Sequence, residues 1–506
     1  MELVELRGSV SPEIKGIAYN SLKVEPGFLF VAIRGLKEDG HNFIEEAVGK
    51  GAQAVVMEIP KPEFNGATRI TVPDSRKALA LLSARFYGDP SEGIKLIGIT
   101  GTNGKTTTAY LTESILKQNG YRVGVIGTIK HWYPEKVLTA QHTTPESWEL
   151  QGILREMADH RVDCAVMEVS SHALNLRRVD GCQFDVGLFT NISQDHLDYH
   201  GSMEDYFASK QKFFLEKLPE SRKQNKWAIF NLDDPWVSSI GIPPGLKPLR
   251  FGRKEGAEVT AQNARLSLEG IRAKLKLPQG NLEISSSLLG EFNLSNIMAA
   301  TAVGVSLKIP REKIRKGIKA ALPIPGRMER VANKRGINIF VDYAHTPQAL
   351  QSVLESLSGL TPGRIITVFG CGGDRDQSKR PLMGEISARL SDLTIITSDN
   401  PRGEDPDRII SDISQGTESV LGGHRQYSPR KITERFKTKG YLTVADRKEA
   451  IRMAVAVARK GDSVLIAGKG HEHYQIVGNK QVLFDDAEQV REAFKSLNHH
   501  GKAESR

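Results

Sequence analysis

The stretch GTNGKTT, residues 101–107, constrains the fold of this chain more than any other. It follows a short apolar run, KLIGIT (95–100), and precedes TTTAYLTESILKQNGY, where apolar residues recur with helical spacing. A strand, a glycine-rich loop and a helix in this order indicate an α/β sheet that binds phosphate at the loop. Backbone N–H groups of such loops face the phosphates; here Lys105 would reach the β- and γ-phosphates and Thr106 would ligate Mg²⁺.

The loop departs from the full GxxxxGK pattern, because its first glycine would fall at Ile99, between Gly98 and Gly101. A glycine-rich turn without a ligand is the structural alternative, but the flanking strand and helix favour a nucleotide. We expect Lys105 to be exposed in the loop. The motif does not distinguish a motor, a GTPase-like switch or a kinase. The nucleotide-binding residues predicted here are Gly101, Thr102, Asn103, Gly104, Lys105, Thr106 and Thr107.

Strand and helix patterns predict three domains, as the length of 506 residues also suggests. Residues 1–88 contain short β-like runs and close with a helical stretch. Residues 89–326 contain the apolar strands of a parallel sheet covered on both faces, followed by a more β-like insertion. Residues 327–506 restart the alternation, which favours a Rossmann-like sheet. We therefore expect an α/β protein with a small N-terminal α/β domain, a central parallel-sheet P-loop domain and a C-terminal Rossmann-like domain.

Composition excludes several classes of protein. The net charge is +9, but Lys and Arg are scattered, so a nucleic-acid partner is not expected. The excess charge indicates either a solvated surface or attraction of an anionic substrate. Three distant cysteines argue against a disulfide framework or a thiolate zinc site and fit a reducing cytoplasm. No signal peptide is expected at the start, and no apolar run approaches the ~18 residues that span a membrane.

Carboxylates and imidazoles follow two predicted strands near the phosphate loop. Glu168 ends the apolar run CAVME, and TNISQDHLDYHG contains Asp195, His196, Asp198 and His200. Taken singly, His196 is more often a hydrogen-bonded loop histidine than a ligand. Together with Glu168 and the phosphate loop it favours a second Mg²⁺ that is partly held by substrate phosphates.

A second polar turn, SDNPRGEDP (398–406), follows the apolar run LTIITS and carries one cation, Arg402. Asn and Pro can occupy such a turn for its geometry alone, with the charges facing water. However, the carboxyl end of a strand in an α/β sheet is also where ligands bind. Arg402 is therefore a candidate for an anionic ligand, and pairing with Glu404 or Asp405 on the surface is the alternative.

The order of several motifs resembles that of the Mur ligases, ATP-dependent amide-forming enzymes of peptidoglycan precursor synthesis. The resemblance spans essentially the whole chain and is carried by GTNGKTT, MEVSSHALNLRRV, TNISQDHLDYHG, EFNLSNIMAA, PGRMERV and VDYAHTP. CGGDRDQSKRPLMG, SDNPRGEDP and AGKGHEHYQ are similar to the family members that add diaminopimelate. The resemblance implies three domains, which bind the UDP-sugar, ATP and the incoming amino acid.

The resemblance also implies roles for individual residues. The UDP-muramoyl substrate would contact Ser21, Thr143, Thr144, Ser170 and Arg178. Some relatives have a glutamine two residues before that arginine, where this chain has Leu176, so this contact is not carried over. Segments that reach the nucleotide from the domain junction include Asn293, Arg327, Asp342 and His345. A helix cap, a surface arginine and a strand-end turn are the structural alternatives for these four.

Lys210 matches a lysine that the family carbamylates. A carbamate would turn the cation into an anionic oxygen donor, which then ligates or orients Mg²⁺ with Glu168 and His196. Without the resemblance, a lysine in an amphipathic helix reads as a solvated cation. The implied catalytic residues are Lys105, Glu168, His196 and Lys210, and the implied metal ligands are Thr106, Glu168, His196 and carbamylated Lys210.

The implied acceptor is meso-2,6-diaminopimelate, which differs from lysine by a distal carboxylate. Arg402 would bind that carboxylate with two parallel hydrogen bonds. Arg375 would hold a carboxylate, and Gly468 and Glu472 would admit the amino acid and pair with its distal ammonium. The acceptor residues implied are Arg375, Asp399, Asn400, Pro401, Arg402, Gly468 and Glu472.

The implied reaction activates the D-glutamyl γ-carboxylate of UDP-N-acetylmuramoyl-L-alanyl-D-glutamate as an acyl phosphate, with ATP and Mg²⁺. We expect a monomeric cytoplasmic enzyme that acts on small molecules without stable membrane insertion. One alternative is a lysine-adding Mur ligase or a folylpolyglutamate synthase, which share the ATP site. Another is a nucleotide switch that uses the same loop without ligation. Phosphate release that depends on the amino acid would separate the ligases from the switch.

Overall fold

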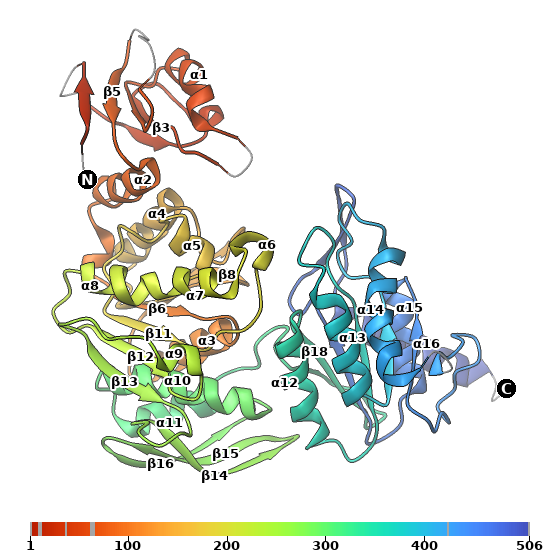
Figure 1. Cartoon of the computed structure of the whole chain (residues 1–506). Helices are drawn as coiled ribbons and strands as arrows, with labels where there is room; N and C mark the ends of the chain where they lie inside the picture. The colour runs from red at the N-terminus through yellow and green to blue at the C-terminus, as the bar shows by residue number, and fades with distance from the viewer. Residues whose placement is uncertain (1–2, 9–12, 36–37, 61–65, 423–424, 504–506) are drawn as a thin grey trace.

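The computed structural model describes residues 3–8, 13–35, 38–60, 66–422 and 425–503. Three α/β bodies follow one another along the chain, each built around its own main sheet (Figure 1). The predicted α/β class and three-domain architecture are thereby confirmed. Within the described residues, no helix is long and apolar enough to cross a membrane.

The N-terminal body has a five-stranded sheet in the order β1-β5-β4-β3-β2, parallel except where β1 pairs with β5. Its helix α2 begins after Asp74, whose side chain accepts a hydrogen bond from the backbone N–H of Lys77 and so caps the helix. The elements are β1 (Glu5–Arg7), β2 (Gly16–Ala18), β3 (Phe28–Val31), α1 (Ile44–Gly49), β4 (Ala54–Met57), β5 (Thr68–Thr71) and α2 (Ser75–Phe86).

The central body has an eight-stranded sheet in the order β13-β12-β11-β6-β10-β7-β8-β9. It is parallel from β13 to β7, and the β8–β9 hairpin continues it antiparallel. Its strands are β6 (Lys95–Thr100), β7 (Val123–Ile126), β8 (Lys130–Tyr133), β9 (Lys136–Thr139), β10 (Cys164–Glu168), β11 (Val186–Phe189), β12 (Trp227–Asn231) and β13 (Lys247–Phe251).

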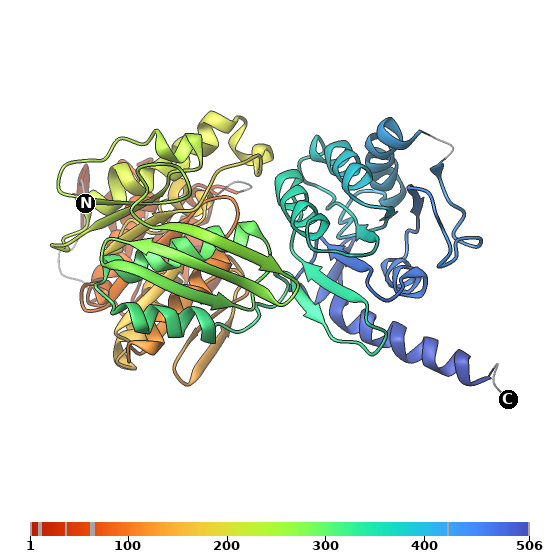
Figure 2. The same ribbon diagram turned by 90° about the horizontal axis from the view of Figure 1, so that it is seen from below.

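Separate apolar clusters cover the two faces of this sheet, as the continuous apolar runs predict. The helices are α3 (Lys105–Gln118), α4 (Ser147–Asp159), α5 (Ser171–Asn175), α6 (Leu197–His200), α7 (Met203–Lys212), α8 (Leu218–Glu220), α9 (Pro235–Ser238), α10 (Glu291–Ser306) and α11 (Arg311–Ala320). The β-like insertion forms an antiparallel sheet of β14 (Thr260–Ser267), β15 (Gly270–Leu277) and β16 (Gly280–Ser286). This small sheet covers one face of the central body (Figure 2).

The C-terminal body has a six-stranded sheet in the order β17-β18-β22-β19-β20-β21, parallel except for β17. Helix α12 lies on the side that faces the central body (Figure 1). The elements are β17 (Glu329–Val331), β18 (Asn338–Asp342), α12 (Pro347–Ser358), β19 (Ile365–Phe369), α13 (Lys379–Leu390), β20 (Leu393–Ile396), α14 (Pro406–Leu421), β21 (Gly440–Thr443), α15 (Arg447–Val457), β22 (Ser463–Ala467), β23 (Tyr474–Val477), β24 (Lys480–Leu483) and α16 (Asp486–Ala503).

Candidate active site

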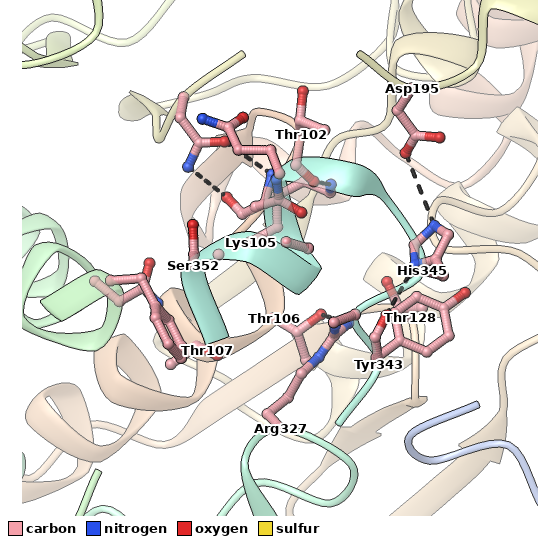
Figure 3. Close-up of a pocket in the computed structure, with 18 of the residues that line it drawn as sticks. Thr102, Lys105, Thr106, Thr107, Thr128, Asp195, Arg327, Tyr343, His345 and Ser352 are labelled. Atoms are coloured by element: carbon pink, nitrogen blue, oxygen red, sulfur yellow. Dashed lines mark hydrogen bonds and ion pairs between the residues drawn. The ribbon is translucent and has the colours of Figure 1, made fainter. Parts of the chain in front are cut away.

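A cavity of about 330 Å³ lies where the central and C-terminal bodies meet. One wall is the loop between β6 and α3, and the opposite wall is the segment from β18 into α12 (Figure 3). Both walls follow the carboxyl ends of parallel strands, where ligands of α/β sheets bind.

Two glycines of the phosphate loop have no room for a side chain. A Cβ at Gly104 (φ 85°) would lie 2.3 Å from Oδ1 of Asn296, and one at Gly101 (φ 140°) would lie 1.9 Å from Oγ1 of Thr190. Asn191 holds the loop from the β11 side, because its side chain accepts from the N–H of Asn103 at 2.9 Å. The loop is therefore held rigidly at the start of α3, as phosphate binding requires.

Lys105 is the first residue of α3, and its side chain is half-buried, so the expectation of an exposed lysine was wrong. Its Nζ folds back and donates to the carbonyl oxygens of Gly101 and Thr102, each at 2.9 Å. Burial lowers the pKa of Lys105. Among the described residues, the partners of this ammonium group are these two backbone carbonyl oxygens and no carboxylate pairs with it, which leaves it available to an anionic phosphate.

Thr106 and Glu168 meet on the other side of the loop. The Thr106 hydroxyl donates to Oε2 of Glu168 at 3.0 Å, and Thr128 donates to both carboxylate oxygens through its N–H and its hydroxyl. Glu168 itself is buried. A buried carboxylate next to a hydroxyl is a set of hard oxygen donors, which fits Mg²⁺.

Lys210 is 1% exposed, so the solvated-cation interpretation is wrong. Its Nζ donates to the carbonyl oxygen of Gly101 at 2.9 Å and lies over the ring of Tyr206, 4.7 Å from the centroid. Burial, reinforced by repulsion from Lys105, holds the pKa of Lys210 well below its ordinary value. A neutral amine is the form that reacts with CO₂, so the lowered pKa is compatible with the carbamate, which stays a prediction.

His196 and His345 approach Asp195 from opposite walls. Their Nε2 atoms lie 3.5 and 3.9 Å from Oδ2 of Asp195, and His345 points toward that carboxylate (Figure 3). Burial lowers the pKa of His196 to about 3. His196, Glu168 and Lys210 line the same cavity. In the part of the chain that the structure describes, no three His, Cys, Asp or Glu side chains form a preformed metal cage, so the predicted ligand set stays a prediction.

Arg327 reaches the phosphate loop from the C-terminal body. Its Nη2 lies 3.4 Å from Oγ1 of Thr106, and its guanidinium group stacks 4.5 Å above the Tyr343 ring (Figure 3). Asp342 accepts from the N–H groups of Met328 and Ala344, at 2.6 and 2.8 Å. Burial raises the pKa of Asp342 to about 6.

Asn293 lies behind the cavity rather than in its lining. Its side chain donates to the Leu289 carbonyl at 2.8 Å and accepts from Asn296 at 3.0 Å. Asn296, one turn further along α10, lines the cavity. The predicted residue thus supports Asn296, which was missed although the motif EFNLSN contains both.

The predicted UDP-substrate residues of the central body lie together. Thr144 is buried and donates to the Glu168 carbonyl at 2.7 Å, while the N–H of Ser170 donates to the Thr144 hydroxyl at 3.1 Å. Arg178 donates to the Thr144 carbonyl at 3.0 Å, and Thr143 contacts Thr128 at 3.1 Å. The fifth predicted residue, Ser21, lies in the N-terminal body, where its hydroxyl donates to Glu46 at 3.0 Å.

The acceptor motifs converge at the carboxyl ends of β20 and β22, around a residue that was missed. Lys469 is completely buried, and its Nζ lies 3.4 Å from Oδ1 of Asp399, 3.0 Å from Oδ1 of Asn400 and 3.2 Å from Oε2 of Glu472. Asn400 also donates to Glu472, at 2.8 Å. Glu472 is therefore already paired within the protein, and Gly468 (φ 113°) leaves 3.2 Å between a Cβ and the Asp399 carboxylate.

Arg402 lies with its guanidinium group beside Gly372. Its φ is 52°, a left-handed conformation that is maintained by backbone bonds to Ile476 and Gly478. A Cβ at Gly372 would lie 2.8 Å from Nη1 of Arg402 and 3.8 Å from Cγ of the exposed Arg375, so the two predicted cations flank one glycine. Pro401, also predicted, is buried in the same turn.

Glu404 and Asp405, the alternative ion-pair partners of Arg402, interact with other groups in the structure. Both carboxylate oxygens of Glu404 accept from Nη2 of Arg380 at 2.9 Å, and Asp405 instead caps α14. Arg402 donates to the carbonyl oxygens of Gly373 and Asn400, at 2.9 and 3.5 Å. Surface pairing of Arg402 with Glu404 or Asp405 is therefore wrong for this structure.

A P-loop that lines a cavity between two bodies, with a separate cluster of polar side chains around Lys469, is the arrangement of a nucleotide-dependent enzyme. Family models agree: the Mur ligase family catalytic domain matches residues 13–87, the Mur ligase middle domain 99–304, and the Mur ligase glutamate ligase domain 326–470. The chain belongs to the Mur ligase family.

Two curated relatives are similar over nearly the whole chain. The UDP-N-acetylmuramoyl-L-alanyl-D-glutamate–2,6-diaminopimelate ligase of Geobacter metallireducens is 48% identical and covers 98% of this chain and 97% of the relative. The ligase of the same name from Geobacter sulfurreducens is 47% identical, with 97% of each chain covered.

Solved structures agree with the fold. A structure of a UDP-N-acetylmuramoyl-L-alanyl-D-glutamate–2,6-diaminopimelate ligase matches with a TM-score of 0.67, 32% identity and 96% of each chain covered. The MurF ligase of Thermotoga maritima, solved in complex with ADP, matches with a TM-score of 0.62 at 22% identity, over 96% of this chain and 99% of that one.

Proposed function

We propose that this enzyme joins meso-2,6-diaminopimelate to the D-glutamyl γ-carboxylate of UDP-N-acetylmuramoyl-L-alanyl-D-glutamate, with ATP converted to ADP and phosphate. The observation that carries the proposal is Arg402, a half-buried guanidinium whose acidic neighbour is paired with Arg380. An acceptor that fills this place needs a carboxylate, which diaminopimelate has at its distal end and lysine lacks. The similarity to the Geobacter ligases supports the same acceptor.

The chemistry proceeds in two steps. The γ-carboxylate attacks the γ-phosphorus of ATP, and the bond between that phosphorus and the bridging oxygen breaks. ADP is the leaving group, and the γ-carboxylate becomes an acyl phosphate. The acceptor amine then attacks the activated carbonyl carbon, loses a proton, and phosphate leaves from the tetrahedral intermediate. No protein nucleophile is needed, so the protein contributes positioning and charge.

The phosphate loop supplies the charge. Lys105 exchanges its two backbone carbonyl partners for phosphate oxygens, and Arg327 adds a second cation from the opposite wall. Thr106 and Glu168 would hold Mg²⁺, which neutralises phosphate charge when bound. We assign His196 and carbamylated Lys210 to the same site. Residues of both bodies line the cavity, so closure of one body on the other would keep water from the acyl phosphate.

The three bodies divide the substrates between them. We propose that residues 1–88 bind the UDP-muramoyl substrate, residues 89–326 bind ATP and residues 327–506 bind diaminopimelate. Asn400 and Glu472, held by Lys469, would receive the polar groups of the amino acid. We propose a cytoplasmic monomer whose partners are small molecules, in keeping with three cysteines that are all free and buried.

The test is a reconstituted reaction in which ADP release and product mass are measured together. The expected result is ADP release and a new UDP-tripeptide only when the UDP-dipeptide, ATP and diaminopimelate are all present. A lysine-adding ligase would form the lysine product instead. Hydrolysis of ATP that ignores the amino acid would show a switch and refute the proposal.

A further inference from the structure

The turn that contains Arg402 (398–406, here called the acceptor loop) also contains Glu404. The ion pair between Glu404 and Arg380 of α13 has no role in the reaction described so far. Arg380, on α13, is 0% exposed although it is one of the largest charged side chains of the chain. Its Nη2 donates to both oxygens of Glu404 at 2.9 Å, and its Nη1 donates to Asp412 of α14 at 2.9 Å. A buried arginine that holds two acidic side chains is costly to desolvate, so its placement calls for a reason beyond stability.

Glu404 lies near Arg402, the cation that we propose binds the acceptor. A Cβ at Gly373 would lie 3.2 Å from Cβ of Glu404, and the carbonyl oxygen of the same Gly373 accepts from Nη1 of Arg402 at 2.9 Å. Glu404 also accepts from the N–H of Asp374 at 2.5 Å. The side chains of Glu404 and Arg402 thus both lie beside Gly373, and the two residues are two positions apart in sequence.

We infer that Arg380 is a positioning residue that keeps the Glu404 carboxylate away from Arg402, so that Arg402 stays open for the distal carboxylate of the acceptor. This inference rests on the proposed function, because it assumes that Arg402 binds the acceptor. Without Arg380, Glu404 would lose this ion pair, and Arg402, beside the same glycine, would be a cation that it could pair with. Glu404 would then compete with the substrate for the same guanidinium group, and the apparent acceptor affinity would equal the intrinsic affinity multiplied by the fraction of enzyme in which Arg402 is still open.

The test compares the single variant Arg380→Met with the double variant Arg380→Met/Glu404→Gln. For Arg380→Met we expect the KM for diaminopimelate to rise by roughly tenfold, with kcat and the KM for ATP changing little. Glu404→Gln alone should keep a near-normal KM. The double variant should recover most of the lost affinity, because no carboxylate remains to capture Arg402.

A matched control lies on the same helix. Arg389 pairs with Glu385 on the exposed side of α13, so Arg389→Met removes a cation and an ion pair without reaching the acceptor loop. Its KM for diaminopimelate should match that of wild type. Thermal unfolding of each variant shows whether it is folded, and if Arg380→Met does not fold, Arg380→Lys and Arg380→Lys/Glu404→Gln take its place.

The outcomes separate this inference from the proposed function. A wild-type enzyme that does not use diaminopimelate contradicts the proposed function itself. An active wild type with a folded Arg380 variant of unchanged KM overturns only the inference. A double variant that stays as impaired as the single one also overturns it, because a merely structural role of Arg380 is not relieved by Glu404→Gln.

Discussion

The phosphate region around Lys105 and Lys210 and the acceptor region around Lys469 both contain lysines that are at least partly buried. Their hydrogen-bond partners differ in kind. Lys105 and Lys210 donate to backbone carbonyl oxygens, and no carboxylate of the described residues lies within ion-pair distance of either. Lys469 donates to Asp399, Asn400 and Glu472. Lys105 is available to phosphate oxygens and Lys210 to CO₂, and neither group is part of the fold, whereas Lys469 is paired with carboxylates of the chain itself. Variants of Lys105 and Lys210 should therefore lose catalytic activity and remain folded. The variant of Lys469 should lose both acceptor binding and stability.

The largest effect is expected for Lys105→Ala. Removing the cation that faces the phosphates should lower kcat/KM for ATP by ~10³-fold. The free energy of unfolding should change little, because the side chain contributes only two hydrogen bonds to its own loop. Near-normal ligation by this variant would contradict the phosphate-loop assignment. Unfolding of the variant would instead break the contrast with Lys469.

Lys210→Ala should reduce ligation about as much as Lys105→Ala does, without lowering the melting temperature. The buried amine donates one hydrogen bond and lies over the Tyr206 ring, and within the described residues no carboxylate pairs with it, so its removal leaves no unpaired charge in the fold. A short carboxylic acid added to the buffer should partly restore activity by occupying the place of the carbamate. Intact mass of active, CO₂-equilibrated enzyme gives a second check, and a plain lysine there would contradict the carbamate.

Lys469→Met is expected to impair both stability and acceptor binding. Removing one member of a buried charge network leaves the carboxylates unpaired and should cost roughly 3–5 kcal/mol in the free energy of unfolding. The KM for diaminopimelate should rise while binding of ATP is retained. A fully stable variant with normal acceptor affinity would show that the two regions are not built differently.

The smallest effect concerns the pH dependence of stability at Asp342. Its folded pKa is raised to about 6, so the folded state holds a proton that the unfolded state has already lost. The stabilisation is present below the unfolded pKa, near 3.8, and is lost as pH rises through about 6. The difference in unfolding free energy between wild type and Asp342→Asn should thus fall by roughly 2.5 kcal/mol between pH 4 and 7. A pH-independent difference in unfolding free energy would contradict the raised pKa.

Local patterns predicted much of this arrangement. The apolar runs that precede GTNGKTT, end at Glu168 and precede SDNPRGEDP are strands in the structure, and the predicted site residues follow their carboxyl ends, where parallel sheets bind ligands. These predictions succeeded because they depend on residues close in sequence.

Long-range contacts explain what was missed. Lys469 acts on Asp399 and Asn400 from 70 and 69 positions away, so no local pattern distinguishes it from other lysines. Arg380 and Glu404 are separated by 24 positions. Asn293 and Asn296 both face inward on α10, and only packing decides which one reaches the cavity. The burial of Lys210 likewise depends on the loop that covers it.

The most direct test of the account is the specificity of the acceptor site. Values of kcat/KM for meso-diaminopimelate and L-lysine are measured for wild type and for Arg402→Ala in the same ADP-release assay. Wild type should strongly prefer diaminopimelate, and Arg402→Ala should lose roughly 2–5 kcal/mol of that preference while still binding ATP. Equal use of lysine and diaminopimelate by the wild-type enzyme would contradict the account.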